Sequence, residues 1–251
     1  GAYDVAMQGN ATIGGLTQFL NSGTLTLGAG GGDTLQFTGG VLAGTPSSVE
    51  INGSITALGA GIITLGDADT PVTVTANATV GGASTGQILL GAATLSDGVT
   101  LTLGAGAATP ITVSTISGTA GGAASAIDIN TTGAFVASGA IGTDIGALTI
   151  TNTGGATFVG AVGGVGDEIA AITFVATTGT ILFSNNVYAT DMTNAGGAFN
   201  LAFQGATTSV SNAAQPVIFG TTGQVGFGNG GDTLTFAGGV THTAGPSTLA
   251  G

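Results

Sequence analysis

GGDTLQFTGGV (Gly31–Val41) returns near the other end of the chain as GGDTLTFAGGV (Gly230–Val240), and only two of the eleven positions differ. In both copies Leu and Phe alternate with polar residues, which is the period of a β-strand, and pairs of glycines stand on either side. Two explanations are open. Either one structural unit is repeated, or the acid of the phrase (Asp33, Asp232) serves chemistry such as metal binding. The repeat is the stronger interpretation.

The rest of the chain has the same pattern of alternating segments and turn-forming residues. Short segments with an apolar residue at every second position follow one another, separated by Gly, Ala, Asn, Asp, Ser and Thr. Fifty glycines would each cost about 1 kcal/mol in a helix interior. The pattern therefore predicts an all-β protein, and a short helix or irregular cap stays open only from Val5 to Leu20. Examples of the segments are TLTLG (24–28), VTVTA (72–76), ITVSTI (111–116), IDIN (127–130) and TILFS (180–184).

Core composition separates two β architectures. A sandwich needs large residues between its sheets, yet the 251 residues include only 11 Phe, 2 Tyr and no Trp. A β-solenoid, similar to a parallel β-helix, fills its thin coils with Val, Ile, Leu and Ala and turns at Gly, Asn and Asp. With roughly 20 residues per coil and a coil spacing of ~4.8 Å, about a dozen coils would form a rod of about 60 Å. We predict one elongated solenoid domain over residues 1–251 with an aromatic-richer section at 183–251; an elongated β-sandwich is the alternative.

Charge and composition exclude several partners. The chain has 12 acidic residues and no Lys or Arg, so it has no side chains to neutralise nucleic-acid phosphates or anionic membrane surfaces. No apolar run approaches the ~20 residues of a membrane helix, so we expect no membrane insertion. Zero Cys excludes disulfides and thiolate metal sites. An acidic, cation-free surface favours an extracellular or cell-surface location. A start at Gly1 without a leader-like segment predicts a processed product or an excised piece.

One stretch resembles a known family. TFVGAVGGVGDEIAAITFVATTGTILFSNNVYATDMTNAGG (157–197) is similar to repeat regions of large secreted bacterial surface proteins, the filamentous-haemagglutinin-like and autotransporter-passenger adhesins. The resemblance implies a parallel β-helix, a surface location and a structural or adhesive role. The absence of Lys and Arg departs from that family. The residues that carry the resemblance are Phe158, Gly160, Val162, Gly163, Gly164, Gly179, Thr180, Ile181, Phe183, Asn185, Asn186 and Val187.

Calcium is the one cofactor that the acids bring into consideration. GAGGGDTLQ (28–36) and FGNGGDTLT (227–235) each resemble, with one mismatch, the RTX calcium-binding nonapeptide. That resemblance implies Asp33 and Asp232 as ligands, and Asp67 and Asp69 have the D-x-D spacing of a hard-cation loop. A lone copy cannot supply the six to eight oxygens of a calcium shell, and acids in turns also cap backbone N–H groups without any metal. Turn capping is the stronger interpretation of all four.

No pattern predicts catalysis. Asp167 and Glu168 are adjacent, so their side chains diverge on a strand, and His242 is the only histidine. A solvated turn and a surface strand residue explain them better than an acid–base pair or a triad. We therefore predict a non-enzymatic protein.

These observations lead to one functional hypothesis and one alternative. The hypothesis is a structural protein of the extracellular surface: a self-assembling fibre or surface-layer subunit, or an adhesin-like β-solenoid. We expect a homo-oligomer or filament formed through strand edges, with a host surface or glycan as a further ligand. The alternative is a calcium-dependent, RTX-like extracellular binding module.

Overall fold

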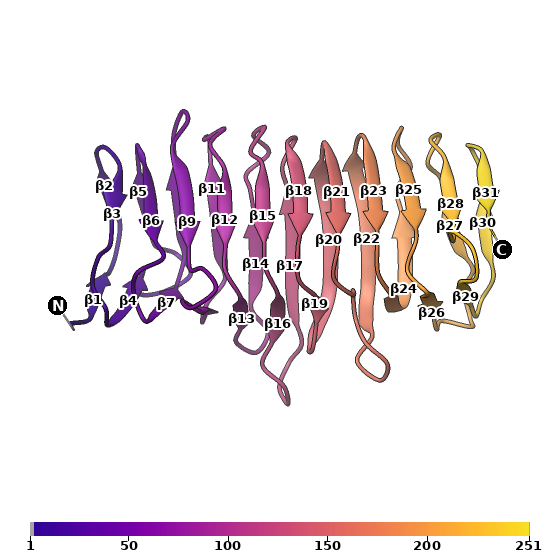
Figure 1. Ribbon diagram of the computed structural model, residues 1–251, viewed down its shortest axis with the longest axis horizontal. Helices are drawn as coiled ribbons and strands as arrows, with labels where there is room; N and C mark the ends of the chain where they lie inside the picture. The colour runs from indigo at the N-terminus through magenta and orange to yellow at the C-terminus, as the bar shows by residue number, and fades with distance from the viewer. Residues whose placement is uncertain (1–2, 251) are drawn as a thin grey trace.

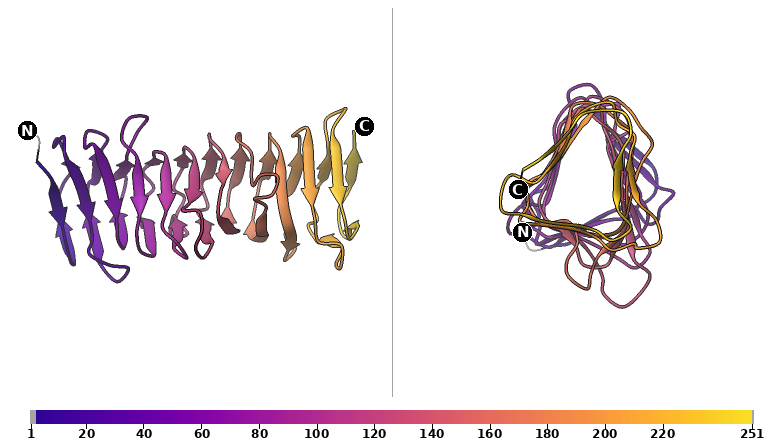
Figure 2. Two further views of the ribbon diagram at one scale, coloured as in Figure 1. Left: turned by 90° about the horizontal axis from the view of Figure 1, so that it is seen from below. Right: turned by 90° about the vertical axis from the view of Figure 1, so that its right-hand side faces the viewer.

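The computed structural model describes residues 3–250, and this part of the chain is a rod of stacked coils (Figure 1). Every regular element in this range is a β-strand, and the strands named below pair in parallel with their neighbours, as Leu25 does with Val49. Seen along the rod, the coils enclose a roughly triangular cross-section (Figure 2). The predicted β-solenoid is confirmed, and the sandwich alternative is wrong because the strands stack along one axis.

Three long sheets and one short pair make up the rod. Sheet 1 consists of β1 (Val5–Met7), β4 (Thr24–Leu27), β7 (Ser48–Ile51), β10 (Val72–Val74), β13 (Ala93–Leu95), β16 (Ile116–Gly118) and β19 (Ile141–Gly142). Sheet 2 consists of β2 (Ala11–Ile13), β5 (Thr34–Phe37), β8 (Ser54–Ala57), β11 (Ala78–Gly82), β14 (Thr100–Leu103), β17 (Ser125–Asn130), β20 (Ile145–Thr153), β22 (Ile169–Thr177), β24 (Val187–Asn194), β26 (Thr207–Val210) and β29 (Thr233–Phe236). Sheet 3 consists of β3 (Thr17–Gln18), β6 (Gly40–Ala43), β9 (Ile62–Leu65), β12 (Ile88–Leu90), β15 (Ile111–Val113), β18 (Ala134–Ala137), β21 (Gly155–Phe158), β23 (Thr180–Phe183), β25 (Asn200–Phe203), β28 (Val225–Phe227) and β31 (Ser247–Leu249). The pair is β27 (Val217–Phe219) with β30 (Val240–His242).

Eleven coils follow from the eleven strands in each of sheets 2 and 3. We number them by their sheet 3 strand, so that coil 1 contains β3 and coil 11 contains β31. Leu25 pairs with Val49 one coil later, which is 24 residues (49 minus 25). The coils are thus slightly fewer and longer than the dozen of roughly 20 residues expected from composition. Beyond β19, sheet 1 continues only as single bridges, from Ile141 to Val162 and from Val162 to Val187.

Alternating side chains build the core. In β4 the leucines Leu25 and Leu27 are fully buried, while the threonines between them face outward. In sheet 3, the rings of Phe158, Phe183 and Phe203 stack coil upon coil, with successive centroids 4.8 and 5.4 Å apart. Such stacking adds about 0.5–1.5 kcal/mol per pair beyond area burial. The stack continues from a tilted contact with Phe135, so the aromatic enrichment begins before the predicted section at 183–251.

Two local expectations change in the structure. The window from Val5 to Leu20 contains the short strands β1, β2 and β3, so the helix left open there does not form. The segment ITVSTI (111–116) is divided between β15 and β16, which lie on different sheets. The chain turns a corner at Ser114 and Thr115. Alternation cannot reveal such a corner because the polar residues of a turn continue the same pattern.

One corner, where the chain enters sheet 3, holds a column of buried hydroxyl groups. Thr131 Oγ1 donates to Thr109 O in the coil before it (2.6 Å), and Thr109 Oγ1 donates in turn to Ser84 O. Thr177 Oγ1 donates to Thr153 O in the same way (3.0 Å). The hydroxyls of Thr131 and Thr109 thus satisfy carbonyls of the turn, whereas Thr153 O accepts from Thr178 N (2.8 Å) as well. The column therefore joins successive coils at a corner where sheet hydrogen bonds are interrupted.

Candidate functional site

The strand of each copy of GGDTL-x-F-x-GGV lies in sheet 2, but the closing GGV leads into β6 of sheet 3 in the first copy and into β30 of the short pair in the second. Asp33 precedes β5 in coil 2 and Asp232 precedes β29 in coil 11, both in sheet 2. Asp33 Oδ2 accepts hydrogen bonds from Ala29 N (2.7 Å) and from Gly9 N of coil 1 (3.2 Å). Asp232 Oδ2 accepts one from Asn229 N (2.7 Å). Both carboxylates close their own glycine turn, and nine coils separate them, so they do not share a site.

The D-x-D loop after β9 is also organised by backbone donors. Asp67 Oδ1 accepts from Asp69 N and from Thr70 N, each at 2.9 Å, and both acids are exposed. Within residues 3–250, no group of three or more His, Cys, Asp or Glu side chains could hold a metal ion. Calcium binding by Asp33, Asp67, Asp69 and Asp232 stays a prediction, and any such ion would depend largely on backbone and water oxygens.

The remaining sequence candidates serve turns. Asp167 Oδ1 accepts from Asp144 N (3.1 Å), and Glu168 Oε1 accepts from Gly166 N (3.3 Å). His242 lies in β30, where its Nδ1 is 2.8 Å from Ser247 Oγ and its Nε2 is 2.9 Å from Thr221 O. These contacts tie together neighbouring coils and loops.

The outer face of sheet 2 carries a column of polar groups that sequence reasoning did not foresee. Thr34 lies beside Ser54, Thr79 beside Thr102, and Thr149 beside Thr173 in neighbouring strands. The column is visible only once the register is known, since neighbouring members are 20 or more residues apart in the sequence.

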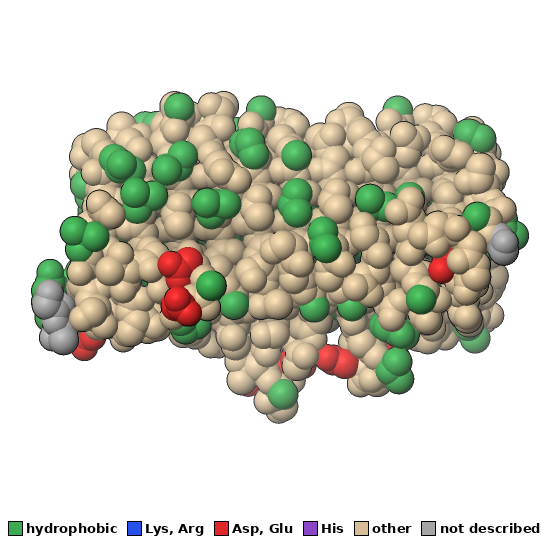
Figure 3. Space-filling view, viewed as in Figure 1, with side chains coloured by type: hydrophobic (Ala, Val, Ile, Leu, Met, Phe, Trp, Pro, Cys, Tyr) green, Lys and Arg blue, Asp and Glu red, His purple; other side chains and the backbone are tan. Residues whose placement is uncertain are grey.

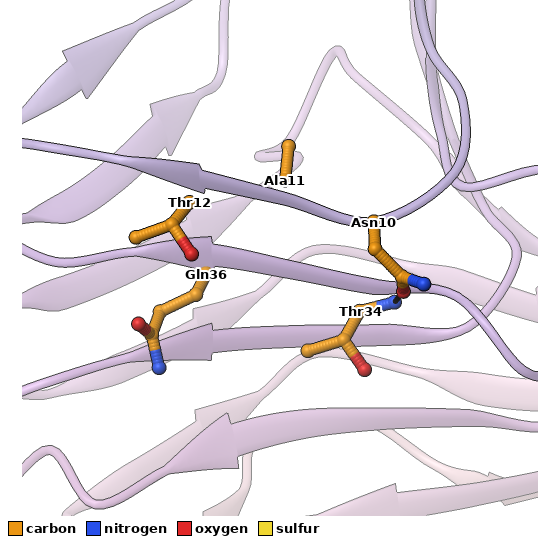
Figure 4. A pocket seen from close by; sticks show the side chains of 5 residues that line it. All are labelled: Asn10, Ala11, Thr12, Thr34 and Gln36. Atoms are coloured by element: carbon orange, nitrogen blue, oxygen red, sulfur yellow. Dashed lines mark hydrogen bonds between the residues drawn. The ribbon is translucent and has the colours of Figure 1, made fainter.

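Two shallow hollows open along this column. The first is lined by Asn10, Ala11, Thr12, Thr34 and Gln36, and Asn10 Oδ1 accepts a hydrogen bond from Thr34 N (2.7 Å) (Figure 4). The second lies over coils 3 to 5, where Ser54, Asn77, Thr79, Thr100 and Thr102 are among its lining residues. Both hollows offer neutral hydroxyl and amide groups, which suit hydrogen bonding to an uncharged, hydroxyl-rich ligand.

The two ends of the rod leave part of the core uncovered. Leu35 and Phe37, in the first copy of the repeated phrase, are 1% and 0% exposed because coils 1 and 3 cover them. Their counterparts Leu234 and Phe236 are only partly buried, because β29 is the last strand of sheet 2. At the other end Val5, Met7, Ala11, Ile13 and Phe19 are likewise only partly buried.

Comparison with protein-family models, with curated proteins and with solved structures found no match to this chain. Within residues 3–250 there is no helix of the length and apolar character needed to cross a membrane.

Proposed function

We propose that this chain is a non-enzymatic structural protein of the extracellular surface, whose copies stack end to end into a fibre or surface layer. The different burial of one phrase at two positions carries the proposal. Leu35 and Phe37 are buried by the coils on both sides, whereas the equivalent Leu234 and Phe236 are covered on one side only and stay partly exposed. In the proposed stack, a coil of a second copy covers them.

The inner column of sheet 3 shows how the two ends would join. It runs through Phe203, Phe227 and Leu249 at one end of the rod, and Leu249 is 76% exposed. At the other end the column starts with Phe19, whose N–H donates to Leu42 O beside Ala43. Head-to-tail stacking places Leu249 against Phe19 of the next copy, and sheets 2 and 3 continue across the junction. Sheet 1 and the β27–β30 pair have no counterpart at the opposite end, so the junction uses two sides of the triangle.

The edge strands also lack the usual protection against pairing. Natural sheets block their edges with charged residues, proline, bulges or a covering helix. The six strands at the two ends, β1, β2, β3, β29, β30 and β31, contain no charged Asp or Glu. Contacts between different patches propagate into a filament unless they close into a ring. A filament is thus the expected assembly.

Particle length tests this proposal. Electron microscopy of the wild-type chain should show particles several rods long, and Phe236→Asp should limit them to the length of one rod. A charge at this position would be buried without a partner in the junction. Thr173→Asp, in the middle of the outer face of sheet 2, is the matched control and should leave length unchanged. Wild-type particles one rod long, or Phe236→Asp particles of wild-type length, would contradict end-to-end stacking.

The polar hollows on sheet 2 favour an adhesive role in addition. Asn10, Thr12, Thr34 and Gln36 present uncharged donors and acceptors on the surface of a rigid sheet, and a neutral glycan is the ligand they match. Binding of the chain to an array of neutral glycans, and its loss in Gln36→Ala, checks this second candidate. Equal binding by the variant would exclude this hollow as the glycan site.

A further inference from the structure

The outer column of sheet 3 alternates between aliphatic and threonine side chains with a period of two coils. Aliphatic residues stand at Leu42, Leu89, Val136 and Leu182 in coils 2, 4, 6 and 8. Threonines stand between them at Thr64, Thr112 and Thr157 in coils 3, 5 and 7. Ala202 follows in coil 9. The face is therefore a row of evenly spaced projections with smaller side chains between them.

The strands of this face carry no charge although the whole chain carries −12, and Asp67 lines the hollow at their edge. No Asp or Glu lies in any strand of sheet 3. In the space-filling view, the upper half, where the strands of sheet 3 lie, shows hydrophobic side chains and no acidic ones (Figure 3). Two copies of a cation-free chain repel each other through their acids, and sheet 3 is the long face where that repulsion is weakest.

We infer that two copies pair face to face through sheet 3, with their rods antiparallel. The two-fold axis runs parallel to the strands and passes between β15 and β18. With this axis, coil k of one copy faces coil 11 − k of the other. Leu89 then meets Thr157, Leu182 meets Thr64, and Val136 meets Thr112. Each large aliphatic side chain of one copy thus packs against a smaller threonine of the other, as side chains interdigitate between paired sheets.

The neighbouring columns match under the same axis. Gly66, Gly91 and Ser114 lie on one flank and help to line a hollow beside Leu89. The residue of the other copy that faces Gly91 is Val159, which projects from the end of β21 and is 48% exposed. A hollow thus faces a projecting valine at two places related by symmetry, as an isologous interface requires.

The acidic residues at the edge of sheet 3 do not repel each other across this interface. Asp67 and Asp69 follow β9 in coil 3, so they face coil 8 of the other copy. The residues that follow the sheet 3 strand there are Ser184 and Asn185, so no acid meets an acid across the interface.

The size of the face is sufficient for a stable dimer. The strands of sheet 3 are mostly three or four residues long. Ten coils at ~4.8 Å, and these strands with the flanking residue that follows each, at ~3.3 Å per residue, give a face of roughly 50 Å by 15 Å. That is about 750 Å² per copy and about 1,500 Å² in total, within the 1,200–2,000 Å² typical of specific interfaces. The pairing uses neither end of the rod, so it goes beyond end-to-end stacking and does not depend on it.

Cross-linking tests the axis directly, because the chain contains no Cys of its own. Leu42→Cys and Ala202→Cys, made as single variants in full-length Phe236→Asp chains, remove end-to-end contacts from the measurement. A short bis-maleimide should join residue 42 of one copy to residue 202 of the other in the mixture. Leu42→Cys alone should give no product, since residue 42 of one chain lies seven coils, about 34 Å, from residue 42 of the other. A product from Leu42→Cys alone would show parallel rods and overturn the proposal, as would no product from the mixture.

A charge variant completes the test. Val159→Asp should abolish the 42–202 cross-link, whereas Thr173→Asp, which adds the same charge to the outer face of sheet 2 between Thr149 and Thr193, should leave it intact. Both sites face solvent in the single rod, and circular dichroism of each variant establishes that it is folded. Persistence of the cross-link in folded Val159→Asp would exclude the proposed contact, whatever the outcome for particle length.

Discussion

Buried hydroxyl groups show how single residues hold successive coils together. Thr131 is fully buried, and its Oγ1 donates to Thr109 O and, at 3.0 Å, to Ala107 O of the coil before it. A chain without Lys or Arg cannot use salt bridges between side chains for this purpose. Carbonyl groups at the corner are satisfied by hydroxyls instead, which explains why Thr and Ser are buried there.

Thr131→Val tests this role because valine keeps the shape of the side chain and removes the hydroxyl, which also accepts a hydrogen bond from Gly133 N (2.9 Å). Leaving a buried acceptor unsatisfied costs about 1–3 kcal/mol, so the free energy of unfolding should fall by that amount in denaturant titration. Thr149→Val, on the outer face of sheet 2, should change it by less than about 0.5 kcal/mol. Equal effects at the two positions would show that the corner hydroxyl contributes nothing particular.

At the scale of strands and turns, the sequence predicted the elements far better than their partners. The alternation in TLTL and TLQF predicts strands, and these form as β4 and β5. The apolar residues of both segments are the buried ones, as alternation predicts. Register is a different matter, because it depends on how many residues each turn consumes. Leu42, Thr64 and Leu89 become neighbours only through turns of unequal length. The alternating column of sheet 3 and the polar column of sheet 2 were therefore invisible in the sequence.

The turn between β4 and β5 yields a prediction at this scale. Gly28 has a φ of +85°, and a Cβ on it would collide with Asn52 O of the next coil. Gly28→Ala should therefore destabilise the fold by at least about 1–2 kcal/mol, the usual cost of a left-handed backbone for an L-residue. Gly30→Ala, in the same turn, meets no atom within 4 Å and should be nearly neutral. Thermal melts of the two variants separate the expectations; equal melting temperatures would contradict the close approach.

For the whole molecule, the dispersed acids make a prediction about calcium. Backbone donors already occupy Asp33, Asp67 and Asp232, so chelation should leave the melting temperature unchanged. A site filled at 100 times its Kd would add about 2.7 kcal/mol to the stability. Melting with and without a chelator decides the point, and a fall of several degrees would favour the calcium-dependent alternative.

Raising the ionic strength should promote the assembly of copies of the rod. All twelve formal charges of the acids are negative and no Lys or Arg balances them, so every approach of two copies meets net repulsion. The contacts proposed at the rod ends and on sheet 3 are uncharged, and salt does not weaken them. Screening shortens from roughly 30 Å at about 0.01 M salt to about 8 Å at 0.15 M. Particle length and the 42–202 cross-link should therefore both increase over this range, as microscopy and gel analysis can measure.

An assembly held by ion pairs would respond in the opposite way, so dissociation on adding salt would contradict the charge-free interfaces.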